Sequence, residues 1–250
     1  MESDICDADI TERVIPTENI QIMFHYKTPF VVIHSEDSFM NQPRSVISGL
    51  SNNYSDVSTN GETGVVFISF YPAGACHFFN FPLSEIENQS VDLTDIFNHE
   101  IRPVEELLYL KETIIERVAV IEDFLVRRYS PIPAYDGMLI QKGVDIINKC
   151  KGQTNAKHLS ECLYTSPKTL ERKFAKYLGK TTKQVIKLIR FRGVLQDLSV
   201  NKNVSFMEYA YNNGYFDHAH FTHDFKSYTG YTPKEFYTKY PDFNVNAESC

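Results

Sequence analysis

The sequence predicts an α+β protein with an N-terminal β-barrel domain that also carries helices, followed by an all-helical C-terminal domain. In the first third of the chain, short segments rich in β-branched and aromatic residues alternate with turn formers such as Asn52-Asn53 and Asn60-Gly61. From Leu83 onward, apolar residues recur at helical spacings instead. The net charge also changes sign between the two parts, which supports a division into two domains.

The charge of the chain is divided very unequally along its length. The 250 residues carry a net charge of −7. Residues 137–250 contain 17 Lys and Arg against 10 Asp and Glu and carry +7, whereas residues 1–136 contain 8 against 22 and carry −14. The basic part is expected to be attracted to phosphate groups and the acidic part to be repelled by them. This pattern predicts two domains with different partners.

The sequence lacks the features of membrane, secreted and metal-dependent proteins. No stretch approaches the roughly 20 apolar residues of a membrane span, and the acidic N-terminus lacks the apolar segment of a signal peptide. The 5 cysteines show no C-x-x-C spacing, which predicts free thiols in the cytoplasm. Neither the strand histidines nor the histidines within residues 218–223 have metal-ligand spacing. We expect no metal, no cofactor and no enzymatic activity, since no catalytic motif occurs.

The N-terminal domain, residues 1–130, is predicted to be a regulatory or sensor domain and a candidate dimerisation domain. Its first 16 or so residues are polar and are expected to be frayed. Strands are predicted at residues 20–26, 30–34, 45–50, 64–71 and 76–81. Their aromatic side chains either line a cavity for a small-molecule ligand or fill the barrel as core. The candidates for ligand contact are Phe67, Phe70, Tyr71, Phe78 and Phe79.

A helical segment and a linker are predicted to follow the strands. Residues 92–97 are expected to form a short apolar turn, and residues 104–129 a long amphipathic helix. This helix is expected to pack mostly on the barrel, with part of it a candidate dimer seam. Residues 131–137 contain two prolines and are predicted to be the linker, with Asp136 capping the next helix.

The first half of the C-terminal domain has a helix-turn-helix pattern. Helices are predicted at residues 138–151 and 155–163. Ser166-Pro167 then starts a helix as cap and first-turn residue, and Gly179 ends it. A further helix at 182–199, about 27 Å long, is expected to lead to a second unit.

Residues 204–236 contain a second helix-turn-helix pattern. Ser205 and Glu208 form a capping box, Gly214 supplies the positive φ of a tight turn, and Asp217 caps the next helix. That helix has an apolar stripe and ends at a glycine before a last capped helix; these residues are Phe221, Phe225, Tyr228, Gly230 and Thr232-Pro233 with Glu235.

At these positions the chain resembles AraC/XylS-type transcription regulators. The second unit matches the family signature at Gly214-Tyr215, Asp217, Phe221, Phe225-Lys226, Thr229-Gly230, Thr232-Pro233 and Phe236. The first unit is similar to the family at Ser166-Pro167, Leu170, Arg172, Phe174 and Leu178-Gly179. The resemblance covers residues 138–240, whereas the N-terminal domain resembles cupin-like regulatory domains only in layout. The chain departs from the family pattern at Ser160, Tyr164, Asp197 and His223.

The resemblance implies a bacterial, sequence-specific transcription factor that binds double-stranded DNA, acts on RNA polymerase and responds to a small-molecule effector, with a homodimer as a candidate state. The alternative is an effector-independent DNA-binding regulator whose N-terminal domain serves only dimerisation or protein contacts. Glu171 is expected either to accept a hydrogen bond from a cytosine amine or to pair with a neighbouring lysine. Residues 241–250 are expected to be a flexible tail. The candidate DNA-contacting residues are Lys168, Thr169, Glu171, Arg172, Lys176, Arg190, His218, Ala219, Thr222, His223 and Lys226.

Overall fold

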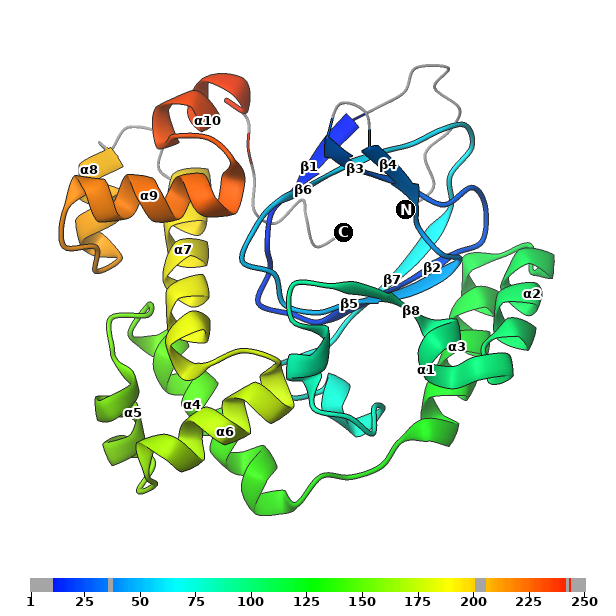
Figure 1. Ribbon diagram of the computed structural model, residues 1–250, viewed down its shortest axis with the longest axis horizontal. Helices are drawn as coiled ribbons and strands as arrows, with labels where there is room; N and C mark the ends of the chain where they lie inside the picture. The colour runs from blue at the N-terminus through cyan, green and yellow to red at the C-terminus, as the bar shows by residue number, and fades with distance from the viewer. Residues whose placement is uncertain (1–10, 36–37, 201–205, 242, 244–250) are drawn as a thin grey trace.

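The computed structural model describes residues 11–35, 38–200, 206–241 and 243 (Figure 1). The predicted fraying of residues 1–10, the predicted cap Ser205 and nearly all of the predicted flexible tail lie outside the described residues. In Figure 1 the strands of the N-terminal half lie on one side of the molecule and the helices of the C-terminal half on the other.

The strands of the N-terminal half form two four-stranded antiparallel sheets, with orders β1-β6-β3-β4 and β7-β2-β5-β8. The strands are β1 Thr11–Val14, β2 Gln21–His25, β3 Val31–Ser35, β4 Ser38–Asn41, β5 Ser45–Ser48, β6 Ser55–Ser58, β7 Val65–Ser69 and β8 Ser90–Asp92. The prediction of an α+β chain with N-terminal strands is confirmed, although the strands form two sheets instead of one closed barrel.

The sheet that contains β2 separates two environments. Ile22 and Phe24 of β2 are fully buried in the main apolar core, on the side of the helices. Met23 points the opposite way and packs with Val46 and Val65 in a small cluster that faces the other sheet. Because successive side chains of a strand point to opposite faces, one strand serves both environments.

Four of the five predicted strands are confirmed, at β2, β3, β5 and β7. The predicted strand at 76–81 is wrong, because Ala75–His77 form the 3₁₀ helix η1 after a turn in which Ala73 has a φ of 61°. Part of the predicted frayed N-terminus instead forms β1, which pairs with β6. The four unpredicted strands have three or four residues each, which is too short to show the apolar alternation on which strand prediction depends.

The predicted long helix at 104–129 is instead two helices. A capping box between Thr113 and Glu116 starts a new helix, and the Arg117 guanidinium donates to the carbonyls of Leu108 and Lys111 at the end of the first one. The break therefore has local causes, and the two helices pack side by side. The helical elements of this region are η2 Leu83–Ile86, α1 Leu93–Phe97, η3 Asn98–Glu100, α2 Arg102–Leu110 and α3 Ile114–Arg128.

The helices of the C-terminal half closely follow their predicted order. They are α4 Ala134–Lys149, α5 Ala156–Cys162, α6 Pro167–Leu178, α7 Thr182–Val200, α8 Phe206–Asn212, α9 His218–Thr229 and α10 Pro233–Lys239. Helix α4 starts four residues before its predicted start, which shortens the connecting segment. Asp136 does not cap α4; its carboxylate instead accepts hydrogen bonds from Lys173 and, at 2.7 Å, from the Tyr177 hydroxyl. Burial and this hydrogen bond raise the pKa of Tyr177 to about 12.

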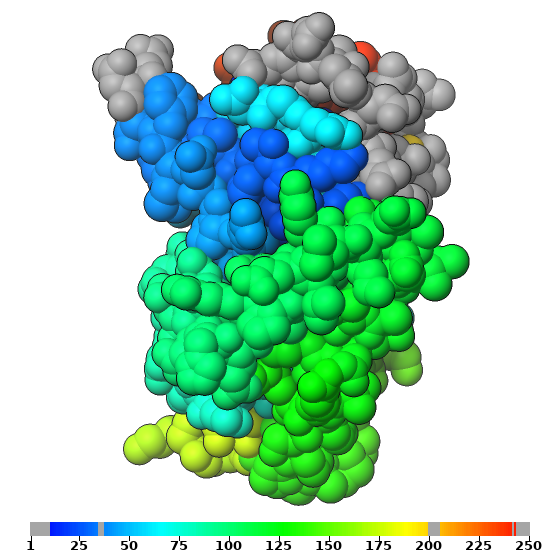
Figure 2. Space-filling view, turned by 90° about the vertical axis from the view of Figure 1, so that its right-hand side faces the viewer, coloured from blue at the N-terminus to red at the C-terminus, as the bar shows by residue number. Residues whose placement is uncertain are grey.

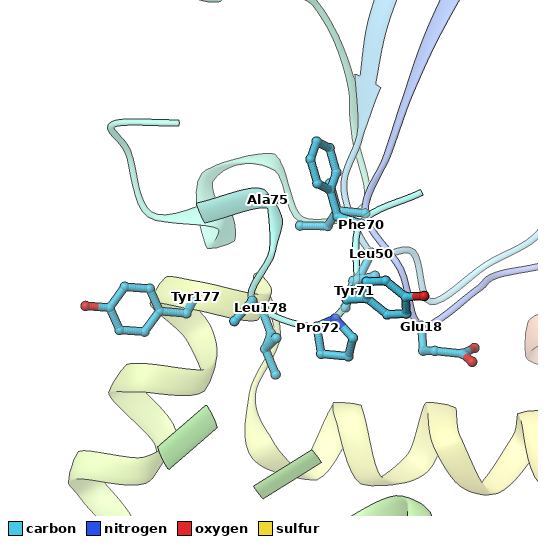
Figure 3. A pocket seen from close by; sticks show the side chains of 10 residues that line it. Glu18, Leu50, Phe70, Tyr71, Pro72, Ala75, Tyr177 and Leu178 are labelled. Carbon is cyan, nitrogen blue, oxygen red and sulfur yellow. The ribbon is translucent and has the colours of Figure 1, made fainter. Parts of the chain in front are cut away.

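The end of α6 packs directly against the N-terminal half. Figure 3 shows Leu178 of α6 beside Pro72 and Tyr71, where these residues line a small pocket. The fully buried Lys180 ammonium lies 2.9 Å from a Glu87 carboxylate oxygen and 3.0 Å from the Asn88 side-chain oxygen. The main apolar core is continuous across this junction.

We expect Glu87→Gln to destabilise the protein by about 1–3 kcal/mol at neutral pH, because the buried Lys180 loses its counter-charge. Burial raises the pKa of Glu87, but the hydrogen bond and charge of Lys180 outweigh it, so the pKa lies below its ordinary value of 4.5. The stability from this carboxylate is therefore complete above pH 4.5 and is lost as pH falls through the lower pKa of the folded protein.

Urea unfolding at neutral pH and at several acidic pH values measures both effects. Glu87→Gln should show a smaller acid-induced loss of stability than the natural protein. The control is Glu85→Gln, which removes an exposed carboxylate from the same turn. Equal pH profiles for the natural protein and Glu87→Gln would contradict the assignment.

Candidate nucleic-acid interface

Helix α6 is anchored by local capping and an apolar face. The Ser166 hydroxyl accepts a hydrogen bond from the Thr169 amide at 3.1 Å, and Pro167 occupies the first turn. Gly179 ends the helix with a φ of 81°. Leu170 and Phe174 are fully buried. These contacts leave the opposite face of α6 turned to solvent.

The exposed face of α6 is positively charged. Lys168, Arg172 and Lys176 are all exposed and four residues apart, so they lie along one face. Within the described part of the chain, none of the three forms an ion pair; Lys173, which points inward, is the α6 lysine that binds a carboxylate, on Asp136. Thr169 is half-buried beside this face. The structure thus brings together the candidates for phosphate and base contact on α6.

Two other candidates are engaged inside the domain. A carboxylate oxygen of Glu171 accepts a hydrogen bond from the Thr182 amide at 3.2 Å, so Glu171 supports the start of α7 instead of pairing with a neighbouring lysine. The Arg190 guanidinium donates to the Gly152 carbonyl at 2.7 and 3.2 Å and lies 5.6 Å from the Tyr215 ring centroid. Arg190 therefore joins three elements of the domain. Its predicted contact with DNA stays a prediction.

Helix α9 presents the predicted face of the second unit. The Asp217 side chain accepts a hydrogen bond from the His220 amide at 2.7 Å and caps the helix as predicted. On the outer side, Thr222 is half-buried, and the exposed candidates are His218, Ala219, His223 and Lys226. This face carries one permanent charge, so α6 has the stronger electrostatic attraction for DNA.

Asp224 on the inner side of α9 was not anticipated. It is 2% exposed, and its carboxylate lies 2.8 Å from the Lys187 ammonium of α7. A buried carboxylate needs such a partner, so this ion pair holds α9 against α7. Sequence periodicity places Asp224 between Phe221 and Phe225, but no pattern names its partner.

Helix α7 separates the two exposed faces. Its 19 residues correspond to about 29 Å at 1.5 Å per residue. Figure 1 shows α7 running from the α5–α6 unit to the α8–α9 unit. This length suits two reading helices that enter successive major-groove segments, which lie about 34 Å apart.

A cavity of about 710 Å³ lies between the two sheets of the N-terminal half. Phe67 lines it, and its contact with a ligand stays a prediction. Phe70 and Tyr71 instead line the small pocket at the junction with α6, while Phe79 is buried and Phe78 half-buried on the helix side of the sheet. For Phe70, Phe78 and Phe79 the core-filling alternative therefore applies.

Among the described residues, no group of three or more His, Cys, Asp or Glu side chains is arranged to hold a metal ion. Within the same ranges, no helix combines the length and apolar character that a membrane crossing needs.

Family models match both parts of the chain. Residues 159–239 match the model described as "Helix-turn-helix domain", and residues 1–92 match "Domain of unknown function (DUF6597)". No curated protein matches the sequence.

Solved structures with a similar fold span both halves or the C-terminal half alone. ToxT from Vibrio cholerae O395, bound to (E)-4-(8-methylnaphthalen-1-yl)but-3-enoic acid, is 10% identical over 92% of this chain and 97% of its own, with a TM-score of 0.51. A DNA-binding transcriptional dual regulator from Escherichia coli K-12 is 22% identical over 46% of this chain and 98% of its own, with a TM-score of 0.38. The C-terminal domain of AraT, a response regulator from Geobacillus stearothermophilus, is 20% identical over 44% of this chain and 88% of its own, with a TM-score of 0.39.

Residues 159–239 are therefore a helix-turn-helix domain, and α6 and α9 are the helices that follow its two turns. The domain is of the AraC type, as the sequence resemblance predicted, and the chain is a DNA-binding transcription regulator. The similarity to ToxT extends the shared fold over the N-terminal half.

Two exposed aromatic side chains at the turns were missed as candidates. Tyr164 is 97% exposed in the turn before α6, and Phe216 is 89% exposed in the turn before α9. Tyr164 has a φ of 50°, a conformation that strains any residue except glycine. The family's frequent glycine at this position is the sequence signal. Because a reading helix contacts bases with its N-terminal residues, we expect both rings to lie beside DNA in a complex.

We expect Tyr164→Gly to stabilise the fold by about 1 kcal/mol and to weaken DNA binding. Glycine removes the backbone strain, with a smaller entropic cost in the unfolded chain. Loss of the exposed ring should remove a contact made only with DNA. Thermal unfolding and operator titration measure the two effects separately. Phe39→Ala is the control, because it removes a 61% exposed ring from the N-terminal half. Operator affinity that is unchanged in Tyr164→Gly would exclude the ring from the interface.

Proposed function

We propose that this regulator inserts α6 and α9 into two successive major-groove segments of one operator. The observation that carries the proposal is the row of three exposed cations on α6 that form no ion pair among the described residues. The long helix α7 follows α6 and leads to the second proposed reading helix. Such cations neutralise phosphates and read guanine edges, with arginine the more specific of the two residue types. The regulator then recruits or blocks RNA polymerase in the cytoplasm, depending on where the operator lies.

A small-molecule effector in the N-terminal cavity is the second part of the proposal. Small-molecule sites typically have volumes of about 300–1,000 Å³, and the cavity between the sheets has about 710 Å³. ToxT, whose fold covers both halves of this chain, has been solved with a naphthyl-butenoic acid bound. These two observations favour a ligand-responsive regulator over an effector-independent one.

A homodimer formed through α2 and α3 is the third part. Their surface, which forms a broad green area in Figure 2, carries large apolar side chains at high exposure. These are Tyr109 at 69%, Leu110 at 70%, Ile115 at 79% and Val126 at 73%. Exposed apolar patches often mark protein interfaces. A second copy that covers this surface would leave α6 and α9 free for DNA.

We expect Arg172→Ala to weaken operator binding by about 1–3 kcal/mol and to relax the preference at one base position. The operator is first located by footprinting the DNA upstream of the protein's own coding region. Affinities for the operator and for random DNA are then compared at one salt concentration. Lys142→Ala on α4 is the matched control, because it removes one exposed positive charge away from the reading helices.

Equal losses on operator and random DNA would show that Arg172 contacts phosphate only. An Arg172→Ala variant that binds both DNAs as the natural protein does would contradict the assignment of α6 as a reading helix.

A further inference from the structure

The cavity between the two sheets has walls of mixed chemistry. Apolar side chains come from both sheets, with Met23 and Phe67 from one and Val32 and Val57 from the other. Between them lie neutral polar groups that can donate or accept hydrogen bonds. They include Gln21, Gln42, Ser48, Thr59, Thr63 and Ser90. Such a surface suits a ligand with an apolar body and several hydrogen-bonding groups.

Lysine and arginine are missing from these walls. None of the described residues that line the cavity is Lys or Arg; the carboxylate among them belongs to Glu12 and the imidazole to His34, and both of these side chains are exposed. The nearest arginine in sequence, Arg13, does not line the cavity. Its guanidinium binds both oxygens of Asp56 at 2.7 Å and the Thr229 carbonyl at 3.1 Å. This arginine is therefore not available to neutralise an anion between the sheets.

A buried pair in the wall is also uncharged. The His25 imidazole lies 3.0 Å from the side-chain oxygen of Gln42, which lines the cavity. Burial lowers the pKa of His25, so the ring stays neutral at neutral pH and donates from Nε2 to this oxygen. The remaining capacity of the Gln42 carboxamide is its NH₂ group, a donor for a carbonyl or hydroxyl oxygen.

Electrostatics disfavour an anionic ligand at this place. A charged group taken out of water needs a counter-charge or several hydrogen bonds. The described walls supply no lysine or arginine, and residues 1–136 carry a charge of −14 that repels anions. An ammonium group would meet a single carboxylate, at the rim, and none in the interior.

We propose that this cavity binds an uncharged, amphipathic small molecule, with an apolar body and hydroxyl, carbonyl or amide groups, and that it discriminates against carboxylates and phosphates. The inference rests on the proposed effector function and names its ligand class. The neutral polar groups of the wall fix the ligand's orientation, while the absence of lysine and arginine from the described walls sets the discrimination.

A set of three probes with one body and different charges tests this. The probes are 1-naphthaleneacetamide, 1-naphthaleneacetate and 2-(1-naphthyl)ethylammonium, titrated into the full-length protein by calorimetry with thermal unfolding in parallel. A ligand that binds only the folded state raises the unfolding temperature. We expect the amide to bind at least about tenfold more tightly than either charged probe, which corresponds to about 1.4 kcal/mol. Equal or tighter binding of the carboxylate or the ammonium would overturn the proposal.

Two variants locate the site and supply the missing charge. Gln21→Lys places a cation in the wall and should reverse the preference in favour of the carboxylate. Its control, Gln141→Lys, adds the same charge to an exposed position on α4 and should change nothing. Val57→Trp fills the cavity and should abolish amide binding. Amide binding that survives in Val57→Trp, or an unchanged preference in a folded Gln21→Lys, would place the probe elsewhere and overturn the proposal.

Operator affinity, measured on the same samples with and without each probe, keeps this inference separate from the proposed function. Failure of all three probes to bind a protein that still binds its operator overturns the cavity inference and leaves DNA recognition standing. Selective amide binding without any change in operator affinity supports the ligand class and contradicts the effector role.

Discussion

The contact between the end of α6 and the N-terminal half fixes the first reading helix, and the rest of the domain follows from it. A side-chain carbon at Gly179 would lie 2.9 Å from the Leu83 carbonyl oxygen, so only glycine permits this approach. The next residue, Lys180, turns into its fully buried position against Glu87. Helix α7 starts immediately afterwards, with the Thr182 amide held by Glu171 of α6. The direction of α7, and with it the place of the second unit, is therefore set at this junction.

The second reading helix is joined to the same half by a separate contact. Arg13 of β1 donates to the Thr229 carbonyl at the end of α9, and its guanidinium lies 3.9 Å from the Tyr54 ring centroid. Tyr54 and Asn88 also line the cavity between the sheets, and Asn88 binds Lys180 at the end of α6. Both reading helices thus share contacts with the cavity wall. An effector that makes different contacts with this wall in two conformations of the protein would therefore change DNA binding.

The helix boundaries of the C-terminal half could be predicted from sequence because their signals are local. The caps at Ser166, Asp217 and Thr232 and the glycines at 179 and 230 act within a few residues, and the structure has all of them as predicted. The row of cations on α6 followed from helical spacing in the same way.

What the sequence could not supply depends on contacts between distant residues. Asp136 is of a residue type that often caps helices, yet its carboxylate binds α6. Glu171 is of a type that can accept hydrogen bonds from bases, yet its carboxylate accepts one from the start of α7. The N-terminal half was predicted less well because β1 and β6 are short and polar and are defined by their pairing partners. The cavity arises from two such sheets facing each other, and no single segment encodes it.

Helix α7 also sets how far α9 is rotated about the α7 axis relative to α6. Each residue of an α-helix turns the chain by about 100° and advances it by 1.5 Å. One residue inserted into α7 would turn the outer face of α9 away from the side on which α6 is proposed to meet DNA, although the distance between them would hardly change. The extended segment at residues 129–133 has no such periodicity, and flexible connections accept added length at small entropic cost. In descendants of this chain, insertions and deletions should therefore accumulate between the two halves and be purged from α7.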